Sequence, residues 1–228
     1  MNNKIFIKEE LRINKKLERA KIIPDKLYKY ISFEKSNQSI NDKKIKCLID
    51  EVLYFGNIRN QNDTDEYNNI LYENEIANSV IVDQIKRKEN RDAICCFTDK
   101  SNNKNLIKKY ANNGCGIMCE FEVFNKSNFY KIQYDKEEYI IHEAGDNEKI
   151  KELNKKKLDL HYITKKLKWR KESEYRLILE NTLLLKKSLI DYNTCGVKLK
   201  SITIYDNCPK EVKQIIIEIA NKQKVKII

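Results

Sequence analysis

The stretch KWRKESEYRLILE, residues 168–180, carries the residues whose types and spacing best suit chemistry. Glu172, Glu174 and Arg176 are two residues apart, so on a β-strand their side chains would point the same way, about 7 Å apart along the chain. Two carboxylates and a guanidinium on one face could hold a substrate. In a helix, Glu172 and Arg176 would instead form a surface i,i+4 pair. The apolar residues from Tyr175 to Leu179 favour the strand.

These residues also have a purely structural interpretation. Glu172, Glu174 and Arg176 could form a ladder of cross-strand ion pairs on a half-exposed sheet, each contributing about 0.2–1 kcal/mol. Trp169, the only tryptophan, could anchor the core or the end of a sheet instead of forming a platform for a ligand.

Metal-binding and nucleophilic patterns are missing from the sequence. The seven cysteines and two histidines show neither the C-x₂-C pairs nor the His-x₃₋₅-His spacing of structural zinc sites, so we expect no metal. A cysteine nucleophile would need Cys96 or Cys119 to meet His142 or His161 in space, which no pattern indicates. The five glycines form no phosphate-binding loop. We expect buried free thiols in a reducing cytoplasm.

Length and composition predict one domain. A chain of 228 residues with 41% hydrophobic residues can bury a core. No apolar run approaches the roughly 20 residues that span a bilayer, and the N-terminus does not resemble a signal peptide, so we expect a cytoplasmic protein without membrane contact. The net charge of +11 favours a polyanionic partner. The alternative explanation for the excess of basic residues is a coding bias toward Lys, Asn and Ile, which is typical of AT-rich bacteria.

The basic stretch NKKKLDLHYITKKLKWRK, residues 154–171, is the best candidate for contact with a polyanion. Its cations could bind phosphates while Tyr162 and Trp169 stack on bases. The alternative is a solvated amphipathic helix whose Leu158, Tyr162 and Leu167 face the core. The candidate phosphate contacts are Lys155, Lys156, Lys157, Lys165, Lys166, Lys168 and Arg170.

Helices and strands follow each other without a regular βαβ period, which predicts the α+β class with a mixed, mostly antiparallel β core and flanking helices. The polar residues 59–67 predict a loop. Helices are expected over residues 5–22, 37–52, 68–90, 102–114, 147–167 and 209–223, the second burying Ile45, Leu48, Ile49 and Val52. Strands are expected over residues 26–33, 53–58, 92–99, 115–123, 129–135, 173–180 and 196–206.

Four of these segments, in order, resemble the bacterial family called domain of unknown function 2971. They are LYKYISF, VLYFGNIRNQNDTDEY, CCFTDKSNNKNLIKKYANNGCGIMCEFE and KWRKESEYRLIL, the last matching a Trp-x-x-Glu-x-Glu-Tyr-Arg signature. The resemblance covers about residues 26–205, between an N-terminal helix (1–24) and a C-terminal helix (209–228), and it favours the strand with Glu172, Glu174 and Arg176 on one face. Thr64 stands where the family usually has proline, Thr98 stands where it has serine, and Tyr205-Asp206 replaces a late glycine-containing turn.

The layout is also similar to that of the ADP-ribosyltransferases, which implies a split-sheet fold and NAD as substrate. The Glu-x-Glu pattern is the form found in their arginine-modifying members. By this resemblance, Glu174 would stabilise the oxocarbenium-like centre that forms when the glycosidic bond of NAD breaks. Glu172 would orient or deprotonate the acceptor.

The same resemblance implies further contacts to NAD. Lys29 would hold a phosphate or ribose oxygen where the usual residue is His or Arg, although lysine offers a point charge in place of a fork. Its structural alternative is an outward residue of its strand. Tyr30 or Tyr54 would stack on nicotinamide. The hydroxyl of Ser32 or Thr98 would support the glutamate by hydrogen bonding. The residues assigned to NAD are Lys29, Tyr30, Ser32, Tyr54, Thr98, Trp169 and Arg176.

Two functions therefore remain open. The first is a bacterial effector of anti-phage defence, abortive infection or toxin type that transfers ADP-ribose from NAD to a protein or nucleic acid, or hydrolyses NAD. The second is a non-catalytic module that binds nucleic acid or a partner protein through the basic stretch. A cavity that joins Lys29, Thr98 and Glu174 would support the first.

Overall fold

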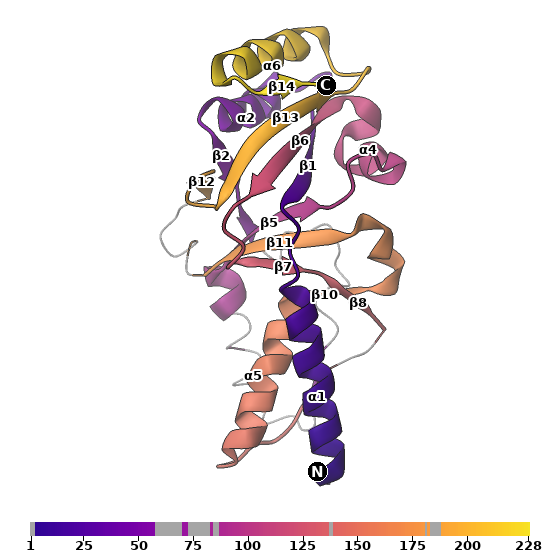
Figure 1. The fold of residues 1–228 in the computed structure, drawn as a ribbon, viewed down its shortest axis with the longest axis vertical. Coiled ribbons are helices and arrows are strands. Elements are labelled where there is room, and N and C mark those ends of the chain that lie inside the picture. The colour runs from indigo at the N-terminus through magenta and orange to yellow at the C-terminus, as the bar shows by residue number, and fades with distance from the viewer. Residues whose placement is uncertain are drawn as a thin grey trace.

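The computed structural model describes residues 3–57, 70–72, 83, 87–136, 139–180, 182 and 188–228. It shows a mixed α+β protein with a mostly antiparallel sheet and flanking helices, which confirms the predicted class (Figure 1). The predicted loop at 59–67 and most of the predicted helix at 68–90 lie outside the described residues. Within the described part of the chain, no helix is long and apolar enough to cross a membrane.

The helices begin with asparagine caps in three cases. The side chains of Asn37, Asn103 and Asn147 accept hydrogen bonds from backbone N–H groups of the first turn, which satisfies donors that a helix N-terminus leaves unpaired. The α-helices are α1 (Asn3–Ala20), α2 (Gln38–Ile49), α4 (Lys104–Tyr110), α5 (Glu148–Tyr162) and α6 (Lys210–Gln223), and the 3₁₀ helices are η2 (Asn112–Gly114) and η3 (Leu167–Glu172).

The main sheet runs through strands that are far apart in sequence. Its order is β14 (Lys226–Ile227), β13 (Val197–Ile204), β6 (Gly116–Val123), β1 (Lys26–Ser32), β5 (Ala93–Thr98), β11 (Glu174–Leu179) and β7 (Phe129–Lys131), with β3 (Gly56–Asn57) also paired to β5. Only the β13–β14 pair is parallel within this sheet.

Three short pairs of strands complete the described fold. Strand β8 (Gln133–Asp135) pairs with β10 (Thr164–Lys166), β2 (Val52–Tyr54) with β12 (Leu189–Asp191), and β4 (Ile70–Tyr72) with β9 (Tyr139–Ile141). Each pair is too short for its own core and therefore depends on the elements around it.

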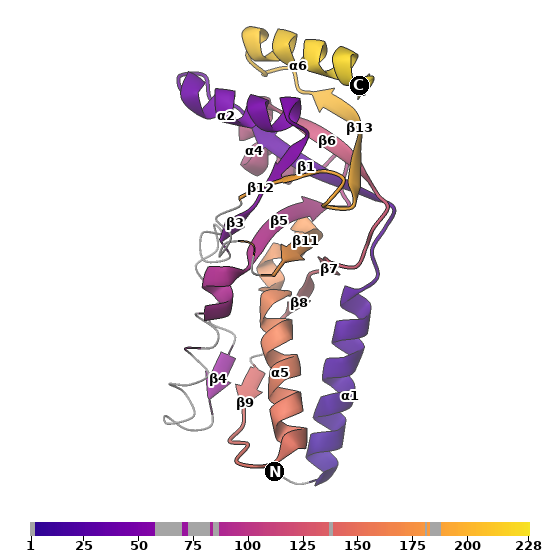
Figure 2. The same ribbon diagram turned by 90° about the vertical axis from the view of Figure 1, so that its left-hand side faces the viewer.

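The main sheet forks between β1 and β5. Strand β1 pairs with β6 along its whole length, from Lys26 to Ser32, whereas it pairs with β5 only at Tyr28 and Thr98. In Figure 2, β1, β6 and β13 lie toward α2 and α6, while β5, β11 and β7 lie toward α1 and α5. The fork therefore brings residues of both halves to the edge where the two strands part.

Two apolar clusters are buried, and the larger one also includes residues of β5, β7 and β11, so it draws on both halves of the main sheet. The larger one joins strand residues such as Leu27 and Phe121 to Ile216 of α6. The smaller one includes Ile13 of α1 and Leu160 of α5, which extend side by side away from the sheet (Figure 1). Because hydrophobic burial is the main stabilising term in folding, these two clusters hold the halves in place.

Several predicted elements need correction. The helix predicted at 37–52 ends at Ile49, whose side chain is 51% exposed, and Val52 begins β2. The strand predicted at 53–58 is divided between β2 and β3, and the strand at 129–135 is broken at Ile132. The helix predicted at 147–167 ends at Tyr162, because the chain then turns into β10.

Candidate functional site

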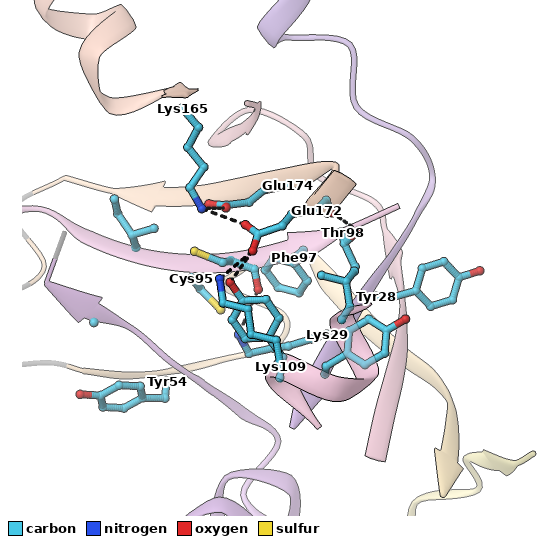
Figure 3. A pocket seen from close by; sticks show the side chains of 16 residues that line it. Tyr28, Lys29, Tyr54, Cys95, Phe97, Thr98, Lys109, Lys165, Glu172 and Glu174 are labelled. Carbon is cyan, nitrogen blue, oxygen red and sulfur yellow. Dashed lines mark hydrogen bonds and ion pairs between the residues drawn. The ribbon is translucent and has the colours of Figure 1, made fainter. Parts of the chain in front are cut away.

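A cavity of about 370 Å³ lies at the fork between β1 and β5 (Figure 3). This volume falls within the range of sites that bind small molecules. Its walls come from both halves of the sheet, from α4 and from β10. Six of the residues predicted for catalysis or NAD binding line it, namely Lys29, Tyr30, Tyr54, Thr98, Glu172 and Glu174.

Glu174 is the first residue of β11, and its carboxylate is buried between two cations. Oε1 accepts a hydrogen bond from Arg176 Nε at 2.6 Å, and Oε2 accepts one from Lys165 Nζ at 2.5 Å. Burial acts to raise the pKa of Glu174, but Arg176 and Lys165 together outweigh it and lower the pKa to about 2. Glu174 is therefore ionised at neutral pH and suits electrostatic stabilisation, not proton donation.

Glu172 does not lie on the strand, which corrects the prediction that it shares a strand face with Glu174 and Arg176. It ends η3, and Ser173 follows with a left-handed backbone (φ 47°). The carboxylate still reaches the same cavity. Its Oε1 accepts from Lys109 Nζ at 2.9 Å and from the Tyr110 hydroxyl at 2.8 Å, and its Oε2 accepts from Lys165 Nζ at 3.0 Å.

The half-exposed charge ladder is also wrong for these residues, because all of them are buried. Glu172 is 8% exposed, Glu174 6% and Arg176 1%. Arg176 lies behind Glu174 and also donates from Nη1 to the backbone oxygen of Tyr162 at 2.7 Å. Arg176 therefore orients Glu174 and does not line the cavity, unlike the NAD contact that the resemblance implies.

Among the described residues, the cavity wall carries more positive than negative groups. Lys29, Lys109 and Lys165 line it together with Glu172 and Glu174, and Arg176 adds a further cation behind Glu174. Burial and the charge of Glu172 raise the pKa of Tyr110, so its hydroxyl stays protonated as a donor. Such a wall favours an anionic ligand.

Lys29 is not the outward surface residue of the structural alternative. Its side chain reaches from β1 across to β5, where Nζ donates to the backbone oxygen of Cys96 at 3.0 Å and lies 5.4 Å from the centroid of the Phe97 ring. The neighbouring Cys95 and Cys96 also line the cavity. Burial raises the pKa of both thiols, so they remain neutral and do not suit a nucleophilic role.

Thr98 and Ser32, whose hydroxyls were predicted to support the glutamate, make other hydrogen bonds. The Thr98 hydroxyl donates to the backbone oxygen of Glu172 at 2.7 Å, so it positions that residue through its main chain. Ser32 lies at the other end of β1, where its hydroxyl accepts from Lys44 Nζ at 3.0 Å, and it does not line the cavity.

Of the three aromatic residues predicted to contact NAD, two line the cavity and one does not. Tyr30 lines the cavity, donates to the backbone oxygen of Lys100 at 2.8 Å and stacks on Tyr205. Tyr54 lines it with a side chain that is 61% exposed. Trp169 lies behind the wall, with its ring centroid 4.0 Å from Lys109 Nζ. Trp169 thus supports a lysine of the wall.

The basic stretch does not form one continuous surface. Lys157 is fully buried and pairs with Glu9 at 2.9 Å, and Lys165 is buried in the cavity wall. Lys156 forms ion pairs with Glu10 and Glu152. Tyr162 packs in the smaller apolar cluster, as the structural alternative predicts. Leu158 and Leu167 are only half-buried, and Leu167 lies in η3, after the helix has ended. The exposed candidates for phosphate contact are Lys155, Lys166, Lys168 and Arg170.

The seven cysteines are free thiols. Five are buried, as predicted, while Cys47 and Cys96 are half-buried. His142 faces Glu9 at 3.5 Å and His161 faces Glu89 at 3.9 Å. Among the residues that the structure describes, no group of three or more potential ligands could hold a metal ion.

Sequence reasoning missed Lys109 and Tyr110 altogether, and it assigned Lys165 only to polyanion binding. No spacing in the sequence indicates that Lys109 and Lys165 reach the same carboxylate.

Comparisons of the chain with family models, curated proteins and solved structures found no match.

Proposed function

We propose that the cavity binds NAD and that the protein is an ADP-ribosyltransferase-like enzyme, which transfers ADP-ribose to an acceptor or to water. The observation that carries this proposal is the meeting of Lys29, Thr98 and Glu174 in one cavity, with Tyr30 and Tyr54 on its wall. Those residues come from four strands, β1, β2, β5 and β11, so their convergence is a property of the fold.

The fork in the sheet supports the same proposal. In a split-sheet fold of the ADP-ribosyltransferase kind, the ligand lies where the two halves separate. Here the halves remain joined at the Tyr28–Thr98 pair, and the cavity lies next to it. The ordered resemblance to domain of unknown function 2971 supports an effector role in bacterial anti-phage defence or in a toxin system, with a protein or a nucleic acid as acceptor.

The proposed reaction uses Glu174 as a fixed negative charge. As the bond between C1′ of the ribose and the nicotinamide nitrogen breaks, its electron pair leaves with nicotinamide, and the carboxylate stabilises the positive charge that develops on the ribose. A nucleophile of the acceptor, or a water molecule, then forms the new bond to C1′. Glu172 takes the proton that this nucleophile loses.

Nicotinamide release from NAD tests the proposal. We expect Glu174→Gln, which keeps the shape and removes the charge, to lower kcat by about 10²–10³-fold while NAD still binds. Lys155→Gln is the matched control, because Lys155 is exposed on α5 and does not line the cavity. Equal turnover by the wild type and Glu174→Gln, with protein and nucleic-acid acceptors present, would contradict the proposal.

A further inference from the structure

Lys109 is the most accessible of the cations that hold the two carboxylates. It lies in the last turn of α4, and its side chain is 36% exposed, compared with 7% for Lys165 and 1% for Arg176. Its ammonium group lies between Glu172 Oε1 at 2.9 Å and the Trp169 ring at 4.0 Å. Of these cations, Lys109 can therefore reach an incoming ligand with the least rearrangement.

Both oxygens of Glu172 are occupied as long as the lysines stay in place. Oε1 accepts from Lys109 and from Tyr110, and Oε2 accepts from Lys165, which also holds Glu174. A carboxylate that already accepts from three donors has little capacity left to accept a hydrogen bond from a substrate. Glu172 gains that capacity only when a lysine turns to another anion.

We propose that Lys109 and Lys165 form a phosphate-binding subsite, in which the phosphate groups of a nucleotide compete with Glu172 for the two ammonium groups. Phosphate oxygens are strong acceptors for lysine, and their contacts with ammonium groups are charge-assisted. The excess of cations on the cavity wall favours this ligand over a neutral one. The inference rests on the proposed function only in its choice of a nucleotide.

This competition makes the site select ligands that carry phosphates. A ligand that carries phosphates draws the lysines away and leaves Glu172 free to accept a hydrogen bond from the group that attacks the ribose. A nucleoside without phosphates leaves Glu172 held by Lys109, Lys165 and Tyr110. The subsite therefore couples recognition of the diphosphate to release of the carboxylate.

A purely structural role for the same contacts predicts a different response. If Glu172 only holds α4 and η3 together, Glu172→Gln loosens the wall and should weaken the binding of ADP and of adenosine alike. If Glu172 competes with phosphate for the lysines, the neutral side chain of Glu172→Gln binds Lys109 and Lys165 more weakly than the carboxylate does. Glu172→Gln should then bind a nucleotide more tightly than the wild type does.

Calorimetric titration with ADP and with adenosine, which differ only in the diphosphate, tests the subsite. We expect ADP to bind at least about tenfold more tightly than adenosine, and Lys109→Gln to lose about tenfold in affinity for ADP but none for adenosine. Lys108→Gln is the matched control, because it removes the same charge from an exposed neighbour on α4 that does not line the cavity. Glu172→Gln should raise the affinity for ADP several-fold.

Three results would overturn the subsite: equal affinity for ADP and adenosine, an equal response of Lys109→Gln and Lys108→Gln, or weaker ADP binding by a folded Glu172→Gln variant. Failure of the proposed function looks different, because ADP has no bond to nicotinamide. ADP binding that depends on Lys109 without any NAD turnover would keep the subsite and remove the reaction. NAD turnover that Lys109→Gln leaves unchanged would keep the reaction and remove the subsite.

Discussion

Two clusters of charged side chains, each with at least one member that is fully or almost fully buried, differ in what surrounds them. The cavity cluster, formed by Glu172, Glu174, Lys109, Lys165 and Arg176, borders the fork in the sheet. The stalk cluster joins α1, α5 and the residue after β9. Its members are Glu9, Lys157 and His142, of which Lys157 is fully buried and also donates to the backbone oxygen of Ile140 at 2.6 Å.

The difference teaches that buried ion pairs alone do not indicate a functional site. In the stalk cluster, Lys157 of α5 pairs with Glu9 of α1 and so holds the two helices together, and none of the three members lines the cavity. In the cavity cluster, cations outnumber carboxylates, and four of the five members line a space of about 370 Å³. Burying charges is costly unless they are paired, so a cluster beside a cavity is the better candidate for chemistry.

The largest expected effect is a loss of stability when Arg176 is removed from the cavity cluster. Arg176→Met leaves Glu174 buried with Lys165 as its remaining ion-pair partner in the cluster. We expect the free energy of unfolding to fall by about 3–5 kcal/mol, measured by urea denaturation. Adding Glu174→Gln to this variant should restore part of the loss. A fall below about 1 kcal/mol would show that Arg176 does not stabilise the buried carboxylate.

A smaller loss is expected in the stalk cluster. Lys157→Met removes the partner of Glu9 and the donor to Ile140, but Glu9 is 17% exposed and can be solvated. We expect a loss of about 1–3 kcal/mol in the free energy of unfolding and no change in ligand affinity. Lys155→Met, at an exposed position on α5, is the control and should stay within about 0.5 kcal/mol of the wild type. Weaker ADP binding by Lys157→Met would contradict the view that only the cavity cluster takes part in ligand binding.

The smallest effect is a pH dependence that belongs to the cavity cluster. The pKa of Glu174 is lowered to about 2 in the folded protein from 4.5, so its ionised form contributes stability that is fully present above pH 4.5 and is lost as pH falls toward 2. The stability difference between the wild type and Glu174→Gln should therefore shrink between pH 4.5 and 3 in urea titrations. A difference that stays constant over this range would mean that the carboxylate has an ordinary pKa.

Much of the fold follows from local patterns in the sequence. The strand from Lys26 to Ser32 and the strand from Ala93 to Thr98 were predicted within about one residue, because apolar and aromatic residues mark them and polar residues bound them. The short strands β9, β10, β12 and β14 were missed, and β4 lies where a helix was predicted. Each has only two or three residues, so tertiary contacts decide their formation, not propensity.

In the site, too, local sequence predicts some features and long-range contacts decide the others. The types and spacing of Glu172, Glu174 and Arg176 drew attention to the right segment, although the left-handed turn at Ser173 moved Glu172 off the strand. Lys109 and Glu172 are 63 residues apart in the chain, and their contact depends on how α4 packs beside η3. No periodicity in the sequence carries such a long-range contact, so the excess of cations became visible only in the folded protein.

The most direct test of the account is a crystal structure of Glu174→Gln with NAD, since this variant should bind NAD without consuming it. We expect the dinucleotide in the cavity at the fork, with its ribose beside residue 174 and its diphosphate in contact with Lys109. A cavity that stays empty at saturating NAD, or NAD bound elsewhere on the protein, would contradict the account.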